Sequence, residues 1–178
     1  PRDATVSEAD MSKAESVANG FERIEAELYQ YLTFRLSRVQ AKLNTQATHM
    51  LREASGITLS QWRIIALVGG AGETRLSMLA RHSALDKGLL SRNLKALVSK
   101  GIVLTKQDQT DHRAQLLSLS PKGKEILQRT LPVSQKRQSL LNETLTKDEL
   151  ETFHRVLEKL EVAADARITR DAPKDITK

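Results

Sequence analysis

Apolar residues recur at every third or fourth position over a long stretch in the first third of the chain. The apolar positions of this stretch are Phe21, Ile24, Leu28, Leu32, Leu36, Val39, Leu43, Ala47, Met50 and Ala54. This spacing predicts one helix over 21–54, about 50 Å long at 1.5 Å per residue. One small domain cannot cover an apolar stripe of that length, so we expect part of it to pack against a second copy of the chain.

Shorter elements follow, and glycines mark their ends. Gly56 is expected to end the long helix, and the run Gly69–Gly72 predicts a break. Thr58 and Gln61 are spaced as a capping box for the next helix. The elements expected beyond the glycine run are a short strand at 74–76 and helices at 77–83 and 86–100, the last one ended by Gly101.

A hairpin is predicted next. Two apolar, partly alternating segments at 102–105 and 116–119 flank the polar stretch 107–113. This pattern is typical of two strands joined by a charged tip. Ser120 and Pro121 then form a helix start, with serine as the N-cap and proline at the first helical position.

Two helices are predicted in the C-terminal part of the chain. Pro132 is expected to interrupt or kink the first, and Thr146 with Glu149 form a capping box for the second. The apolar face of the second helix consists of Leu150, Phe153, Val156, Leu157, Leu160 and Ala164. The ends of the chain, residues 1–19 and 169–178, are polar.

The middle of the chain has the element order helix, short strand, helix, tight turn, helix, hairpin. This is the order of a winged helix-turn-helix. We therefore expect a mainly α fold with a small β-hairpin (α+β), with the winged helix-turn-helix at 58–124.

The positive charge of the chain is concentrated in that lobe. The 178 residues have a net charge of +6, whereas residues 58–124 alone carry 11 basic and 4 acidic side chains, a net charge of +7. A localised basic excess is typical of a surface that binds a polyanion. On charge alone, a solvated basic face without a partner explains these numbers equally well.

The composition excludes several kinds of function. The chain has no cysteine, which excludes thiol chemistry and is compatible with a cytoplasmic location. Its longest apolar run, 64–68, is far shorter than the roughly 18 residues of a membrane span. The four histidines lack metal-ligand spacing, and no phosphate-binding glycine loop or nucleophile elbow is present. We expect no metal, no cofactor and no enzymatic activity.

The helix predicted at 86–100 has two different faces. Its inward residues are Leu90, Leu94, Leu97 and Val98, and its outward residues are Lys87, Ser91, Arg92 and Lys95. Asp86 is expected to cap the first turn. A basic outer face suits the major groove of duplex DNA, where Arg and Lys bond guanine and Ser contacts base or phosphate. A solvated amphipathic helix is the alternative.

The charged tip of the hairpin suits a wing that contacts DNA through Asp111, His112 and Arg113. Arg113 can enter a narrow minor groove, where the negative potential is enhanced. Asp111 can pair with that guanidinium or close the turn. A surface loop with an incidental Asp–Arg pair is the alternative.

The hairpin and the helix start after it resemble a known family. The residues are Asp111-His112-Arg113-Ala114-Gln115-Leu116-Leu117-Ser118-Leu119-Ser120-Pro121-Lys122-Gly123. They meet every fixed position of the pattern D-x-R-A-x-x-L-x-L-[ST]-x-x-G, so the chain resembles the MarR family of bacterial transcriptional regulators. Further similar residues are Gln61-Trp62-Arg63, Leu79-Ala80, Leu85-Asp86-Lys87, Ser91-Arg92, Leu97 and Lys100-Gly101.

The resemblance implies a two-fold homodimer on double-stranded DNA, with the recognition helix in the major groove and Arg113 in the minor groove. Such a dimer predicts a pseudo-palindromic operator with half-sites about one helical turn apart. At Gly88-Leu89 the family often has Ser or Thr followed by Thr, so we doubt any DNA contact from these two positions. The implied segments are a polar arm at 1–19, a first long dimerisation helix at 20–57, the DNA-binding lobe at 58–124, C-terminal dimerisation helices at 125–168 and a mobile tail at 169–178.

The resemblance also implies that a small phenolic or aromatic ligand binds between the dimer helices and the lobe and releases the DNA. The candidate pocket residues are Tyr31, Arg35, Arg38 and Trp62, with an arginine holding a carboxylate. Core or dimer packing is the alternative for the aromatic residues. We expect a cytoplasmic, ligand-responsive repressor without a membrane partner; a winged-helix module for an acidic protein partner is the alternative, and an enzyme is a distant third.

Overall fold

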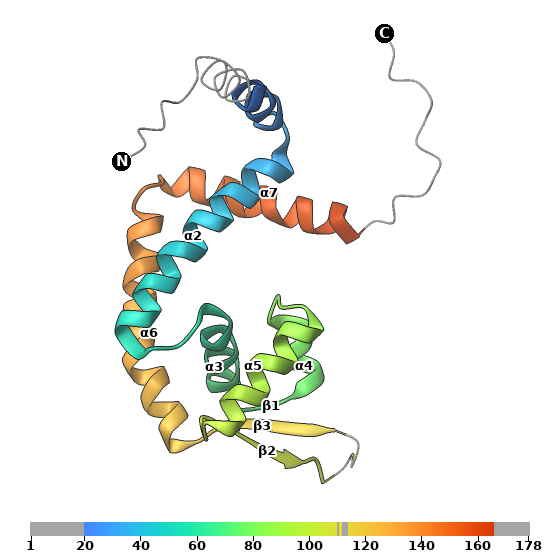
Figure 1. Cartoon of the computed structure of the whole chain (residues 1–178), viewed down its shortest axis with the longest axis vertical. Helices are drawn as coiled ribbons and strands as arrows, with labels where there is room; N and C mark the ends of the chain where they lie inside the picture. Colours follow the sequence, from blue (N-terminus) through green and yellow to red (C-terminus); the bar gives the residue numbers. More distant parts are fainter. Residues whose placement is uncertain (1–19, 110, 112–113, 166–178) are drawn as a thin grey trace, which may run out of the picture. The chain divides into compact units, whose positions relative to one another are not determined.

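A computed structural model describes residues 20–109, 111 and 114–165 of the chain (Figure 1). The predicted arm at 1–19, the predicted tail at 169–178 and the wing residues His112 and Arg113 lie outside the described residues. The chain divides into two compact units, Pro1–Leu127 and Gln128–Lys178, and each is considered by itself.

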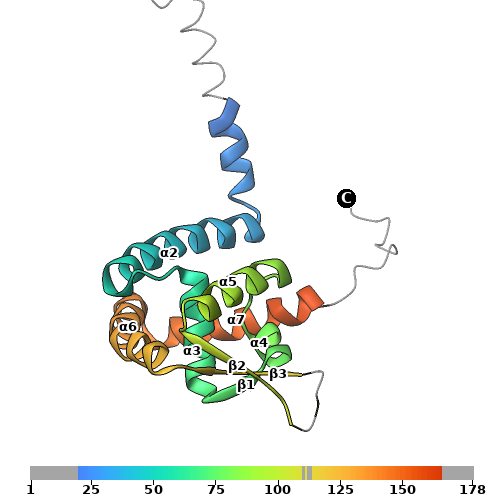
Figure 2. The same ribbon diagram turned by 60° about the horizontal axis from the view of Figure 1, so that its bottom comes forward.

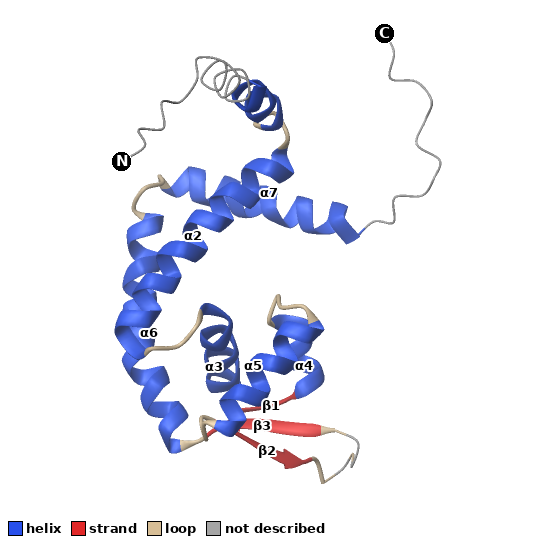
Figure 3. Cartoon of the chain, viewed as in Figure 1, coloured by secondary structure: helices blue, strands red, loops and turns tan. Residues whose placement is uncertain are grey.

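Helices make up most of the described chain, together with three short strands (Figure 3). After a helical segment at 20–28, the elements are α2 (Leu32–Ser55), α3 (Leu59–Ala71), β1 (Glu73–Arg75), α4 (Leu76–His82), α5 (Lys87–Ser99), β2 (Val103–Gln107), β3 (Gln115–Leu119), α6 (Pro121–Asn142) and α7 (Lys147–Asp165). The predicted fold class, mainly α with a small β-hairpin, is confirmed. In this part of the chain, no helix is both long and apolar enough to cross a membrane.

The three strands form one antiparallel sheet in the order β1-β3-β2. β2 and β3 are the predicted hairpin, with Val103 opposite Leu119 and Gln107 opposite Gln115. β1, predicted from the sequence as a short strand at 74–76, pairs with β3 and places Arg75 opposite Leu116. In Figure 2 the strands lie side by side, with β3 in the middle.

α3 contributes the largest share of the fully buried core. Ile64, Ile65 and Val68 of this helix have 0% exposure. They belong to one buried apolar cluster with Leu97 of α5 and Leu117 of β3. Because α5 and the hairpin share this core, close packing fixes the position of one relative to the other.

The predicted helix over 21–54 is wrong in one respect, because the structure interrupts it at 29–31. Tyr31 has extended backbone angles and is the N-cap residue of α2. Aromatic residues are weak helix formers. Contacts between residues on the two sides of the interruption also stabilise the interrupted conformation. The Arg38 guanidinium lies 4.8 Å from the centre of the Tyr29 ring and pairs with Glu25 on the preceding segment.

Two further expectations also need correction. The predicted break at Gly69–Gly72 occurs only at Gly72, because α3 continues to Ala71. Gly69 lies inside the helix, where a Cβ would come within 2.4 Å of Leu127 Cδ2, so close packing accounts for this glycine. The predicted interruption at Pro132 is wrong, because α6 is continuous from Pro121 to Asn142, whereas the alternative of a kink there stays a prediction. The Leu, Gln, Lys and Arg residues that flank Pro132 are good helix formers, which offsets part of the proline cost.

Candidate nucleic-acid interface

α5 carries the residues predicted to contact DNA. Its buried residues are Leu90, Leu94 and Leu97. Its exposed residues include Lys87, Ser91, Arg92 and Lys95. The predicted separation of an apolar inner face from a basic outer face is therefore confirmed, and a contact between that outer face and DNA remains a prediction.

The first turn of α5 is capped as the sequence predicted. Asp86 Oδ1 accepts a hydrogen bond from the Leu89 backbone N–H at 2.8 Å. A capping interaction of this kind stabilises a helix by about 1 kcal/mol. In the turn that precedes it, Ala84 has a φ of 51°, in the left-handed region. α4, this turn and α5 form a helix-turn-helix with α5 as its second helix.

Gly88, the second residue of α5, lies beside Arg92. A Cβ on Gly88 would be 3.4 Å from Arg92 Nη1 and 3.3 Å from Asp86 Oδ1. The missing side chain therefore leaves space for the Arg92 guanidinium close to the helix backbone. The departure from the family pattern at this position changes the surroundings of Arg92, which is itself a predicted contact residue.

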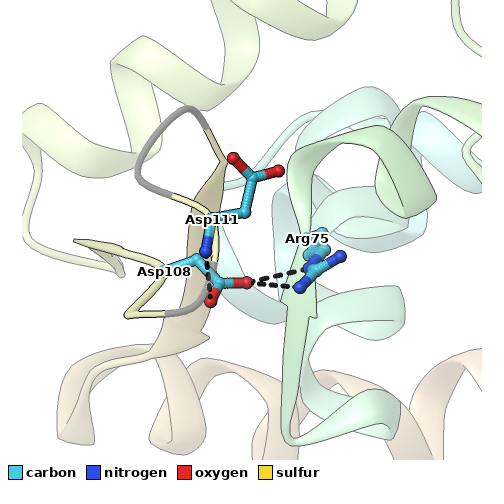
Figure 4. A network of polar contacts seen from close by, with 3 residues as sticks. All are labelled: Arg75, Asp108 and Asp111. Atoms are coloured by element: carbon cyan, nitrogen blue, oxygen red, sulfur yellow. Dashed lines mark hydrogen bonds and ion pairs between the residues drawn. The ribbon is translucent and has the colours of Figure 1, made fainter.

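The base of the wing is organised by Asp108, whose side chain is 8% exposed (Figure 4). Its Oδ2 accepts a hydrogen bond from Arg75 Nε at 2.9 Å and lies 2.7 Å from Arg75 Nη2. Its Oδ1 accepts a hydrogen bond from the Asp111 backbone N–H at 3.4 Å. Asp111 O in turn accepts from the Ala114 N–H at 2.8 Å, so Asp111 takes part in closing the turn, one of its two predicted roles.

The Arg75–Asp108 pair was not predicted from the sequence. The two residues are 33 positions apart, so no local spacing connects them. Asp108 lies in a stretch predicted to be a polar loop, and nothing in its neighbours indicates burial. Only the pairing of β1 with β3 brings Arg75 to the wing.

Ser120 and Gly123, two fixed positions of the family pattern, join the hairpin to α6. Ser120 Oγ accepts a hydrogen bond from the Gly123 N–H at 3.0 Å and donates one to Gly101 O at 2.6 Å. A Cβ on Gly123 would lie 2.3 Å from the backbone oxygen of Ile102, so only glycine fits there. Both positions therefore act by packing and capping within the lobe.

The four candidate ligand-pocket residues are not brought together in one chain. Trp62 is buried in the apolar cluster that also includes Leu51, near the C-terminal end of α2. Tyr31 is 62% exposed at the opposite end of that helix, about 30 Å from Leu51 at 1.5 Å per residue. Arg35 is exposed and Arg38 pairs with Glu25. Within the described ranges, no three His, Cys, Asp or Glu side chains form a group that could hold a metal.

The described elements define the class of protein. A helix-turn-helix, a basic exposed second helix and a hairpin on a shared core make a winged helix-turn-helix lobe. Comparisons with known proteins agree. A family model described as "MarR family" matches residues 55–114. An uncharacterized HTH-type transcriptional regulator of Staphylococcus aureus is 24% identical over 115 residues, which cover 64% of this chain and 79% of that protein.

Solved structures share the same fold. A crystal structure of a MarR mutant from E. coli, complexed with operator DNA, has a TM-score of 0.60 and 28% identity and covers 71% of this chain and 93% of that one. A crystal structure of NadR in complex with 4-hydroxyphenylacetate has a TM-score of 0.62 and 25% identity, and it covers 73% of this chain and 92% of that one. The winged helix-turn-helix lobe of this chain therefore resembles the MarR family of DNA-binding transcriptional regulators in both sequence and fold.

Proposed function

We propose that this protein is a cytoplasmic repressor that binds a pseudo-palindromic operator as a homodimer and responds to a small aromatic ligand. The observation that carries the proposal is the exposed basic face of α5. Lys87, Ser91 and Lys95 follow one another at steps of four residues, so they extend over about 12 Å of the helix. The major groove of B-DNA is about 12 Å wide, and it admits one helix with such a face.

The wing supplies the second proposed contact. Asp111, His112 and Arg113 follow β2, whose root shares the buried core with α5. A wing anchored on the same core as the recognition helix engages DNA together with it, so the two contacts reinforce each other. We assign Arg113 to the minor groove and Lys87, Ser91, Arg92 and Lys95 to the major groove.

Exposed apolar residues near both ends of the described chain support dimerisation. Phe153 and Val156 on α7 are 46% and 41% exposed, and Phe21 and Ile24 in the helix at 20–28 are 69% and 50% exposed. Large apolar side chains that gather on an exposed face mark sites of association. We therefore assign residues 20–57 and 125–168 to the dimer and residues 58–124 to DNA.

The ligand class is inferred from a structural neighbour and from the side chains near the start of α2. NadR, which shares the fold, was crystallised with 4-hydroxyphenylacetate, a phenolic carboxylate. Tyr31 and Arg35 are exposed on successive turns, and an arginine can bind a carboxylate with two parallel hydrogen bonds. Trp62 is a core residue, so we expect its contribution to be indirect. Addition of 4-hydroxyphenylacetate should lower the affinity for operator DNA.

A selection experiment tests the proposal. The full chain is used to enrich duplexes from a random-sequence pool, and its affinity for the enriched duplex is compared with that for unselected DNA over a range of salt concentrations. We expect a strong preference and a log–log salt slope of about −0.9 for each phosphate contacted. Arg92→Ala should weaken the preference by about 1–3 kcal/mol. Arg52→Ala, which removes the same charge from the exposed last turn of α2, is the control.

The pattern of enrichment tests the dimer as well. A pseudo-palindromic enriched sequence and a sedimentation mass of two chains are the expected results. Equal binding to enriched and unselected duplexes, or an Arg92→Ala variant no weaker than Arg52→Ala, would contradict the assignment of α5 to the major groove.

A further inference from the structure

We propose that Arg75 is a positioning residue for the wing, and that it acts through the carboxylate of Asp108. This inference rests on the proposed function, because positioning of the wing affects binding only if the wing contacts DNA. Arg75 lies on β1 next to α4, whereas Asp108 directly follows β2 at the start of the wing turn. Their ion pair therefore ties the start of the wing to the helix-turn-helix side of the lobe.

The Asp108 carboxylate is held firmly because it is buried. Among the residues that the structure describes, it is the only carboxylate in the buried class, with 5% of the residue exposed. A buried charge is strongly unfavourable unless it is paired and hydrogen-bonded. Two nitrogens of Arg75 approach its Oδ2, and the Asp111 N–H donates to its Oδ1. One carboxylate thus joins strand β1 to the turn of the wing.

The backbone of the turn is tied to the same residue. The Asp108 N–H donates to Ala114 O at 3.0 Å, and the Ala114 N–H donates to Asp111 O at 2.8 Å. Three described residues of the turn, Asp108, Asp111 and Ala114, are therefore linked to one another, and Asp108 also reaches β1. Loss of its charge would remove this tie to β1 while leaving the hairpin ladder of β2 and β3 intact.

A neighbouring ion pair crosses the sheet in the same direction but does not reach the turn. Lys106 Nζ on β2 lies 2.7 Å from Glu73 Oε2 on β1, and both side chains are well exposed, at 63% and 42%. Exposed pairs of this kind contribute little to stability. Glu73 therefore provides a matched control for Asp108. It has the same charge and also pairs with a basic residue across β3. It lies on β1 two residues before Arg75, at the end of the strand away from the wing.

The functional consequence is preorganisation. A wing whose base is already held by Asp108 loses less conformational entropy when it enters a groove than a wing whose base must be ordered on binding. This positioning role predicts that Asp108→Asn changes the affinity for DNA in the opposite direction to the loss of a negative charge alone. Asp108→Asn removes a negative charge, which on its own should strengthen binding to polyanionic DNA. If Asp108 and Arg75 position the wing, Asp108→Asn should weaken binding instead.

The test uses the full-length protein and a fluorescent duplex enriched from a random pool by the parent protein. Asp108→Asn should raise the dissociation constant by about 5- to 20-fold, as expected for lost ordering of the wing. Glu73→Gln, with the same change in charge, should bind as tightly as the parent or slightly more tightly. In an Arg113→Ala background, Asp108→Asn should cause no further loss of affinity, because the wing contact it positions is already absent. Thermal unfolding verifies that each variant is folded.

The possible outcomes are distinct. If the parent prefers its enriched duplex but Asp108→Asn binds as well as Glu73→Gln, the inference is wrong and the proposed function stands. An equal loss of affinity with and without Arg113→Ala would also overturn it, because such a loss reflects general destabilisation. If Asp108→Asn does not fold, Arg75→Gln is compared in the same two backgrounds with Lys106→Gln, which removes the same charge from the neighbouring ion pair; equal losses of affinity in these two variants would also overturn the inference. A parent without preference for any enriched duplex would refute the proposed function and this inference with it.

Discussion

The first unit and α7 carry the same kind of apolar pattern, but only one of them buries it within the chain. In the first unit, 15 apolar side chains form a single buried cluster. α7 has apolar residues at the same helical spacing, yet none of its residues is buried anywhere along its described length. A hydrophobic period therefore predicts a helix in both places but does not reveal what covers its apolar face. The lobe is stabilised by its own chain, and we expect α7 to need the surface of another.

The largest expected effect is in the core of the lobe. Leu97 on α5 has 0% exposure, so Leu97→Ala should lower the free energy of unfolding by about 2–5 kcal/mol. Urea denaturation at a fixed protein concentration measures the change. The control is Lys95→Ala on the exposed face of the same helix, which should alter stability by less than about 0.5 kcal/mol but weaken DNA binding. Equal stability losses in the two variants would contradict the separation of the two faces.

The next effect concerns α7 and the dimer. Val156→Asp places a charge in the exposed apolar stripe of α7 and is repeated in both copies of a two-fold dimer. We expect it to weaken dimerisation by about 2–4 kcal/mol, measured by sedimentation equilibrium. Arg155→Gln, which changes the charge by the same amount on the opposite face of the helix, should leave the dimer intact. A dimer unaffected by Val156→Asp would mean that this stripe does not form the interface.

Local signals in the sequence were sufficient for most of the fold. The capping boxes at Thr58 and Thr146, the Asp86 cap and the hairpin each depend on residues close together in the chain, and the structure contains all of them. The interruption of the first helix near Tyr31 was missed, because residues on both sides of it stabilise it together. Gly69 was misinterpreted as a breaker because its packing partner, Leu127, is distant in the sequence.

As with the fold, the parts of the candidate site that depend on local spacing were predictable from the sequence, and the parts that depend on distant residues were not. The outer face of α5 follows from the period of one helix, so its lysines and Arg92 could be assigned from the sequence. The pair of Arg75 with Asp108 depends on strand pairing across 33 positions, which no local pattern encodes. The exposed basic face of α5 was therefore accessible to sequence reasoning, whereas the Arg75–Asp108 pair at the base of the wing was not.

A smaller effect is expected at the turn of the helix-turn-helix. Ala84 has a φ of 51°, a conformation that glycine adopts without strain and that costs other residues about 1 kcal/mol. Ala84→Gly should therefore raise the free energy of unfolding by several tenths of a kcal/mol, up to about 1 kcal/mol, in urea denaturation. The control is Ala80→Gly in the exposed helical part of α4, which should be destabilising. Destabilisation at both positions would argue against strain in this turn.

The smallest effect tests what α7 contributes by itself. Hydrogen bonds from the backbone and side chain of Thr146 lower the pKa of Glu149 in the capping box of α7. A lowered pKa in the folded state means that the ionised carboxylate stabilises the fold above its unfolded pKa, and that this stabilisation disappears as the pH falls through the folded pKa. Glu149→Gln preserves the acceptor of the capping box without its charge. We therefore expect the parent to melt at a slightly higher temperature than Glu149→Gln at pH 7, and the difference to shrink as the pH falls below the ordinary pKa of a glutamate, as followed by circular dichroism. A constant difference between the two proteins across this range would show that the charge of Glu149 does not stabilise α7, and that the helix depends on the surface that covers it.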